Sequence, residues 1–258
     1  MILTTGPAMK RISIILRLTI LGLLVSPERL PAEIADQTSS IGQPTADGRA
    51  RISGKVSLAA MQPSTKRLPV FKNRGFCGPS VPNEALLVSR EGGLRNAVVL
   101  LYPLDRIATV QPGRMVLDNI QCAFVPHVQV VPIGSELLLK NSDPILHTVH
   151  ARLGKETLFN VGLPQWRQIS KVLKRPGVLR INCDVLHTWM SAAIVVTTTP
   201  HFAISDEKGF FALDHLPAGA YEAEIWHEKL GTKTQRISLD GDTSLTLEVV
   251  FGSGQEKR

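Results

Sequence analysis

The sequence predicts an all-β protein, a larger β-sandwich followed by a smaller β-sandwich module. Short runs of apolar and β-branched residues recur along the chain and are separated by many of its 20 Gly and 17 Pro residues. Such runs are typical of strands joined by turns. Aromatic residues make up only 5% of the chain and no long apolar repeat of helical period occurs. A hydrophobic content of 43% over 258 residues is enough for packed cores.

The N-terminal residues 1–35 are predicted to be a signal peptide. A basic start at residues 9–11 precedes a mostly apolar stretch over 12–25, which Arg17 interrupts. This stretch is shorter than the roughly twenty apolar residues that a membrane span needs. We therefore expect a periplasmic or secreted protein. Arg17 and the poorly defined cleavage site near Ala35 leave a retained membrane anchor open.

After a polar linker at 36–49, residues 50–198 are predicted to form the larger sandwich. Its strand-like runs are apolar or alternate between apolar and polar residues, and each is bounded by turn-forming residues. They cover residues 52–58, 85–89, 97–102, 124–131, 136–140, 147–151, 178–182 and 192–197.

Residues 199–252 are predicted to form the smaller module, followed by a tail at 253–258. The module contains Ser205-Asp-x-x-Gly-x-Phe211 and then Leu216-Pro-x-Gly-x-Tyr221. These motifs resemble those of carboxypeptidase regulatory-like, transthyretin-like β-sandwich modules. About fifty residues are short for a complete domain. A strand borrowed from the region around 52–56 would complete it.

A thiol, an imidazole and a thioether lie close together at Cys183, His187 and Met190. Strand-like runs flank this segment on both sides, so a Cys at a strand end, a His in the turn and a Met before the next strand can point at one atom. Soft sulfur with imidazole suits copper, and two His, one Cys and a weak axial Met form a blue-copper electron-transfer site. The missing ligand has to come from elsewhere, and His147 or His150 can supply it.

This arrangement resembles the cupredoxin family. The resemblance rests on the Cys183–Met190 segment, on His147-Thr-Val-His150, which is similar to the family's His-Asn-Val segment, and on the interval between them. It implies a Greek-key β-sandwich and one copper ion. The implied ligands are His147, Cys183, His187 and Met190. The order of motifs along the chain also resembles exported cupredoxin-like proteins described as methylamine-utilisation-like, a description that says little about a substrate.

Two departures from the family pattern bear on the kind of site. Three residues separate Cys183 from His187, where mononuclear members commonly have two or four, and this spacing also resembles the binuclear copper A loop. That loop carries another Cys four positions earlier, where this chain has Leu179, so a mononuclear site is favoured. Thr148 replaces the family's usual Asn, which changes the hydrogen bonds expected around the sulfur and with them the reduction potential.

Three histidines compete for the remaining ligand position. His147 and His150 are three residues apart and face opposite sides of a regular strand. His147 aligns with the family's first ligand and is favoured, with His150 the alternative if the strand register is shifted. His127 lies in an apolar strand-like run and is a weaker candidate for a metal ligand or a partner-facing residue.

The chain has three cysteines, an odd number that leaves one free thiol in an oxidising compartment. If Cys183 binds copper, Cys77 and Cys122 remain to form a disulfide. In the chain-entropy model, a bridge closing such a loop stabilises the fold by about 3–4 kcal/mol. The other pairings would consume Cys183 and remove the copper site.

The net charge of +7 falls to about +5 once residues 1–35 are removed. The basic residues are spread out and lack interleaved aromatics, so nucleic acid is a poor candidate partner. We expect a redox partner protein in the cell envelope, and membrane association only if the N-terminal segment is retained.

The leading hypothesis is therefore a non-enzymatic copper protein that transfers electrons. The alternative is a non-redox envelope-binding or copper-storage module whose copper site is vestigial. A hydrolase ranks third: Asp143 with His147, or Asp184 with His187, read as acid–base pairs, but no nucleophile motif accompanies them. The His-x-His pairs that mark multicopper oxidases are absent from the sequence.

Overall fold

The computed structural model describes residues 50–59 and 66–252. Within these ranges it contains eighteen strands, β1 to β18, and one four-residue helix, α1, so the predicted all-β class is confirmed. The predicted signal peptide (1–35), linker (36–49) and tail (253–258) lie outside the described residues. No helix in the described part of the chain is long and apolar enough to cross a membrane.

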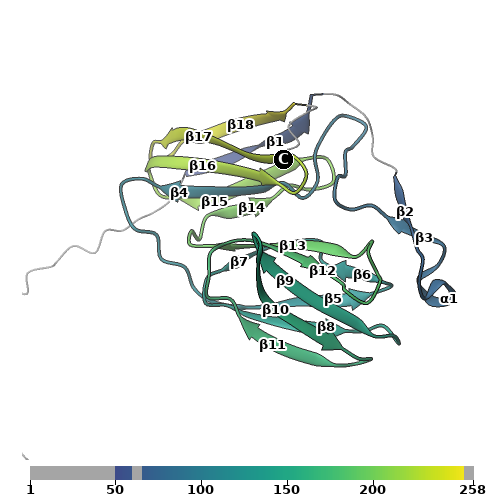
Figure 1. Cartoon of the computed structure of the whole chain (residues 1–258). Coiled ribbons are helices and arrows are strands. Elements are labelled where there is room, and N and C mark those ends of the chain that lie inside the picture. The colour runs from purple at the N-terminus through teal and green to yellow at the C-terminus, as the bar shows by residue number, and fades with distance from the viewer. Residues whose placement is uncertain (1–49, 60–65, 253–258) are drawn as a thin grey trace, which may run out of the picture. The chain divides into compact units, whose positions relative to one another are not determined.

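Residues 114–197 form the sandwich that carries the predicted copper ligands (Figure 1). One sheet has the order β10-β9-β12-β13-β7 and the other β11-β8-β5-β6. The pairs β13–β7 and β5–β8 are parallel and the remaining pairs are antiparallel. The strands are β5 (Arg114–Ile120), β6 (Ala123–Val125), β7 (Val128–Pro132), β8 (Glu136–Asn141), β9 (His147–Leu153), β10 (Glu156–Leu163), β11 (Gln168–Val172), β12 (Gly177–Asn182) and β13 (Ser191–Thr197).

The core of this sandwich follows from alternation along its strands. In β8, Leu137 and Leu139 are fully buried while their neighbours are partly exposed, as expected when successive side chains point to opposite faces. Leu179 and Ile181 of β12 do the same from the facing sheet. Each fully buried aliphatic side chain contributes about 1.5–3 kcal/mol, so the sheet ends that hold the predicted ligands rest on a rigid base.

Further strands form the second sandwich, whose sheets have the orders β15-β1-β18 and β14-β4-β16-β17. Its core includes Ile52, Leu101, Tyr221 and Phe251. The strands are β1 (Ala50–Leu58), β4 (Val98–Pro103), β14 (Phe202–Ile204), β15 (Phe210–Leu216), β16 (Gly219–His227), β17 (Gly231–Leu239) and β18 (Ser244–Phe251).

Strands from before residue 199 and strands from after it pair with one another in the second sandwich. Strand β1 runs parallel to β18 from Arg51 to Leu58 and antiparallel to β15, so the strand that the C-terminal segment lacks comes from the region around 52–56. Strand β4 joins the other sheet, beside β14 and β16. Both faces of β4 are covered: Val99 and Leu101 lie in the core of the second sandwich, while Val98 and Leu100 pack against β7 and β13. The apolar run in β4 follows from this double burial.

The two C-terminal motifs have local structural reasons. The Asp206 carboxylate accepts hydrogen bonds from the backbone N–H groups of Lys208 and Phe210, and Gly209 takes a φ of +85° in the same turn, a conformation that favours glycine. The Tyr221 hydroxyl donates to the carbonyl of Pro217 at 2.6 Å. The resemblance of this segment to carboxypeptidase regulatory-like modules stays a prediction.

Two predicted strands differ in the structure. Residues 124–131 form two strands in different sheets, since β6 pairs with β5 and β7 pairs with β13; Pro126 lies between them and has no N–H to continue a ladder. Residues 85–89 form no strand and contribute one isolated bridge, Val88 to Leu94. Burial of Ala85 and Val88 accounts for the apolar run there without a ladder.

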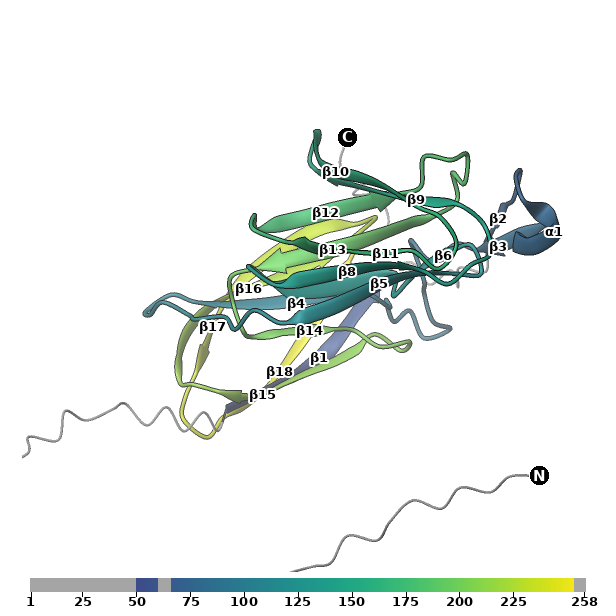
Figure 2. The ribbon, with the colours of Figure 1, turned by 90° about the horizontal axis from the view of Figure 1, so that it is seen from below.

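A short segment from 66 to 83, which we call the strap, packs on one end of the first sandwich. It contains β2 (Arg67–Pro69), α1 (Arg74–Cys77) and β3 (Ser80–Pro82), and β2 pairs with β3. Figures 1 and 2 both place it beside the end of the sandwich near β6. Its residues Val70, Cys77 and Val81 are buried in the core of that sandwich.

Gly54 provides a test of the pairing of β1. A Cβ at Gly54 would lie 1.9 Å from the carbonyl oxygen of Leu247 in β18. We expect Gly54→Ala to lower the free energy of unfolding by about 1–3 kcal/mol, because the backbone there has to move. The matched control is Gly162→Ala in β10, where a Cβ meets nothing within 4 Å. Urea unfolding that gave equal stabilities for the two variants would contradict the pairing.

Candidate metal centre

Strand pairing brings the predicted ligands to one end of the first sandwich. Strand β12 lies between β9 and β13. Cys183 follows the last residue of β12, His147 is the first residue of β9, and His187 lies in the loop that leads to β13. Because β9 and β12 are antiparallel neighbours, the start of one meets the end of the other.

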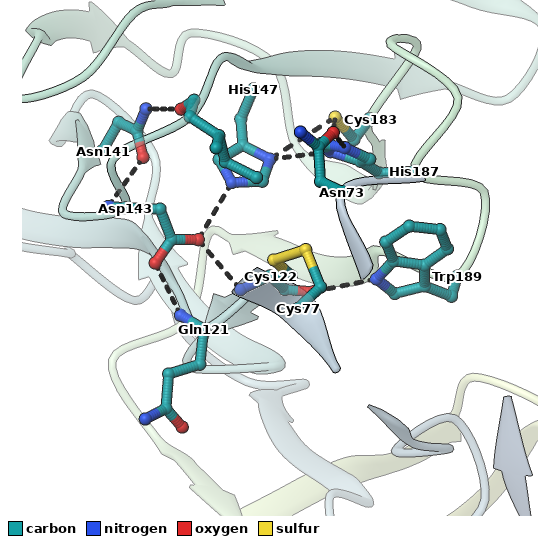
Figure 3. The surroundings of a disulfide bond; sticks show 11 residues. Asn73, Cys77, Gln121, Cys122, Asn141, Asp143, His147, Cys183, His187 and Trp189 are labelled. Carbon is teal, nitrogen blue, oxygen red and sulfur yellow. Dashed lines mark hydrogen bonds and ion pairs between the residues drawn. A yellow bond between two sulfur atoms is a disulfide. The ribbon is translucent and has the colours of Figure 1, made fainter. Parts of the chain in front are cut away.

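Three ligand atoms converge in the space between these elements (Figure 3). The Nδ1 atoms of His147 and His187 are 3.0 Å apart, and the Cys183 Sγ lies 3.9 Å from the first and 3.7 Å from the second. All three residues are at most 5% exposed. Metal–nitrogen bonds of about 2.0 Å and metal–sulfur bonds of about 2.3 Å place two ligands of one ion about 3–4 Å apart, so the three separations suit a single metal ion.

The far side of each imidazole is held by a hydrogen-bond acceptor. The Nε2 of His147 lies 2.9 Å from the Asp143 carboxylate, which also accepts from the N–H groups of Gln121 and Cys122. The Nε2 of His187 lies 2.9 Å from the amide oxygen of Asn73. An acceptor at Nε2 keeps the ring proton there, so both Nδ1 atoms are left as lone-pair donors for a metal.

Burial and hydrogen bonds set the charge states of the ligands. Burial raises the pKa of the Cys183 thiol, but hydrogen bonds from His147 and from the Thr148 N–H, 3.3 Å away, outweigh it and bring the pKa below its ordinary value. Burial lowers the pKa of His147, but the bonds to Asp143 and Cys183 raise it above its ordinary value. The shift at Cys183 favours the thiolate, which is the form of Cys that binds metals.

His187 stays neutral at physiological pH. Burial, the nearby charge of His147 and then that of Lys72 lower its pKa to about 4. The cluster therefore offers three candidate electron-pair donors, Cys183 Sγ and the two Nδ1 atoms. A metal cation that displaced any proton held between them would satisfy all three.

Met190 adjoins the cluster. It is 2% exposed, belongs to the same core, and its N–H donates to the carbonyl oxygen of His187. Trp189 is also buried; its N–H donates to the carbonyl of Cys122 and its ring centroid lies 5.1 Å from that of His187. The ligand loop is thus packed into the core on its Trp189 and Met190 side.

The other two candidate histidines lie outside the cluster. His150 is bonded to Asp184 and Thr157, as expected if it faces the side of β9 opposite to His147. His127 pairs with Glu228, the residue that follows β16, with 2.7 Å between Nε2 and Oε2. Of the two acid–base pairs considered from sequence, Asp143 contacts His147, whereas Asp184 contacts His150 and not His187.

The cysteines pair as predicted. Cys77 and Cys122 form a disulfide, and Cys183 is the free cysteine of the chain. Leu179, at the position of the second thiolate of a binuclear centre, is buried in the core.

Sequence reasoning missed Asn73 as a partner of the site and assigned Asp143 only to a rejected acid–base pair. Asp143 stands four residues before His147, a separation that could have suggested their contact. Asn73 lies more than a hundred residues from His187 in sequence, and nothing local marks it.

No family model matches the chain, and no curated protein sequence matches it. Among solved structures, the chain is similar to several proteins at low identity and low TM-score. A novel purple cupredoxin from Nitrosopumilus maritimus is 20% identical, with 32% of this chain and 96% of that one covered and a TM-score of 0.28. A reduced amicyanin variant is 18% identical, and the match covers 38% of this chain and 98% of that one with a TM-score of 0.30. A copper-containing nitrite reductase from Thermus scotoductus SA-01 is 19% identical, and the match covers 37% of this chain and 25% of that one with a TM-score of 0.31.

Asp143→Asn tests the outer support of the cluster. An amide cannot accept from His147 and from two backbone N–H groups as a carboxylate does, so we expect the metal-free protein to lose about 1–3 kcal/mol of stability. Asp184→Asn is the control, because Asp184 is 40% exposed and pairs with His150 outside the cluster. It should cost less than about 1 kcal/mol. Equal losses in denaturant unfolding would count against a special role for Asp143.

Proposed function

We propose that the chain is an exported protein that binds one copper ion through His147, Cys183 and His187, with Met190 as a weak axial ligand, and transfers electrons. The observation that supports this most is the convergence of two imidazole nitrogens and a cysteine sulfur in the core. Two His and one Cys with an adjoining Met are the donor set of blue-copper sites. Bound copper would supply a one-electron change between Cu(I) and Cu(II).

The way the ligands are held favours electron transfer over hydrolysis. His147 is fixed by Asp143 and His187 by Asn73, and the Cys183 sulfur accepts the Thr148 N–H. Ligands locked by packing and by outer hydrogen bonds move little when the charge of a bound ion changes, which keeps the reorganisation small. The Asp143 carboxylate already accepts hydrogen bonds from three donors, so it is poorly suited to act as a general base.

The surface near the cluster suits a protein partner. Leu186, next to His187 in the ligand loop, is 66% exposed, and Leu146, next to His147, is 49% exposed. Contiguous exposed apolar patches are typical of interaction surfaces, and these two leucines would be part of such a patch. We propose that a redox partner protein of the cell envelope docks over this end of the sandwich.

The proposed location is the periplasm or the exterior of the cell. The Cys77–Cys122 disulfide supports it, since disulfides persist mainly in oxidising compartments. We propose no catalytic role for either sandwich, and a scaffolding or binding role for the second.

Copper loading of purified protein tests the function. We expect Cu(II) to produce an intense visible band that bleaches reversibly on reduction, and Cys183→Ser to abolish it even if some copper remains, because the band comes from the thiolate. A Cys77→Ser/Cys122→Ser variant should still give the band at saturating copper while it remains folded, because it keeps Cys183. Copper bound without a band would favour the storage alternative, and a site that took only zinc would overturn the redox function.

Met190→Leu tests the axial ligand. The substitution keeps the volume and removes one weak donor, so copper should stay bound while the reduction potential rises, since Cu(II) loses more stabilisation than Cu(I). The matched control is Met115→Leu: Met115 packs partly buried against the same core from β5. Voltammetry in which both variants kept the wild-type potential would contradict an axial role for Met190.

A further inference from the structure

The strap is attached to the end of the sandwich that holds the ligand cluster. The Cys77–Cys122 disulfide ties α1 to the turn between β5 and β6. Val70 and Val81 are buried in the core of the first sandwich. The Lys72 ammonium group donates to the carbonyl oxygen of Val185, inside the ligand loop, at 3.2 Å. Three separate contacts therefore hold the strap against the metal centre.

One strap residue reaches the ligands. The Asn73 amide oxygen lies 2.9 Å from the Nε2 of His187, on the opposite side of the ring from the atom that faces Cys183 (Figure 3). Asn73 is exposed, whereas His187 is only 1% exposed. Asn73 thus forms the boundary between the solvent and the imidazole.

The residue type at this position suits the task. Asn73 has a φ of 56° and a ψ of 32°, the left-handed conformation that Asn tolerates better than most residues. This conformation places it just before α1, three residues ahead of the exposed Phe76 and four ahead of Cys77. The disulfide at Cys77 therefore restrains the backbone that carries the Asn73 amide.

We infer that the strap is a component of the metal centre, in which Asn73 is a positioning residue that holds His187 Nδ1 toward the cluster and the Cys77–Cys122 disulfide keeps Asn73 in place. His147 is positioned from within its own sandwich, through Asp143, whereas His187 depends on a segment that is held by a cross-link, by buried side chains and by the hydrogen bond from Lys72 to Val185. The identity of the metal in this inference rests on the proposed function. The claim that Asn73 positions His187 does not depend on it.

Substitutions at Asn73 test the inference. Asn73→Gly removes the amide and keeps a backbone that accepts φ of 56°, so the change carries no conformational strain. Asn73→Asp keeps an acceptor oxygen and serves as the rescue variant. Phe71→Ala is the control, since Phe71 belongs to the same strap and is 74% exposed.

The first readout uses the metal-free protein. We expect nitrogen-15 NMR of wild type to show a slowly exchanging Nε2–H on His187. The signal should be lost to solvent exchange in Asn73→Gly and kept in Asn73→Asp and Phe71→Ala. If Asn73→Gly keeps the slow signal, the inference is wrong, whatever metal the protein binds. This result does not depend on copper, so a failure here is distinct from a failure of the proposed function.

The second readout is copper affinity, measured in proteins with and without the disulfide. Loss of an outer partner of a metal-bound histidine typically costs about 10–100-fold in affinity, and we expect this loss in Asn73→Gly but not in the Asp or Phe71 variants. Cys77→Ser/Cys122→Ser should cause a similar loss; both cysteines are replaced because a free Cys122 thiol would lie beside His147 and Asp143. Adding Asn73→Gly should then cause little further loss. Fully additive losses would overturn the claim that the disulfide acts through Asn73.

Discussion

The site is organised by one constraint: two imidazole nitrogens and a cysteine sulfur face each other in the protein core. His147, Cys183 and His187 are almost fully buried, and each Nε2 is engaged by an outer acceptor. Water cannot satisfy these lone pairs as it would at a surface, and burying unsatisfied polar atoms is costly. A bound metal cation would resolve the arrangement, and the proposed function assigns this role to copper.

The fold supplies this constraint through strand order and buried contacts. Placing β12 between β9 and β13 brings His147, Cys183 and His187 to the same end of the sandwich. Leu179 and Ile181 of β12 are fully buried in the core of this sandwich. The outer contacts come from two further segments: the loop before β9 supplies Asp143, and the strap supplies Asn73. The metal centre therefore depends on parts of the chain that are far apart in sequence.

Local patterns were sufficient to predict the disulfide and to select His147, Cys183 and His187, which the fold brings together, because the Cys and His spacing and the odd cysteine count are properties of short segments and of composition. Contacts between distant segments were not predictable. Asn73 has no local mark that points to His187. The run at 124–131 was interpreted as one strand because its apolar pattern continues through Pro126, although the chain there passes between sheets. The run at 85–89 is apolar because it is buried, not because it forms a ladder.

X-ray absorption of the copper-loaded protein tests the central claim most directly, because it counts the ligand atoms around the metal in solution. The account predicts one copper ion per chain with one sulfur and two imidazole nitrogens in its near coordination shell, and loss of the sulfur in Cys183→Ser. A spectrum with no sulfur neighbour, or with a second copper close by, would contradict it.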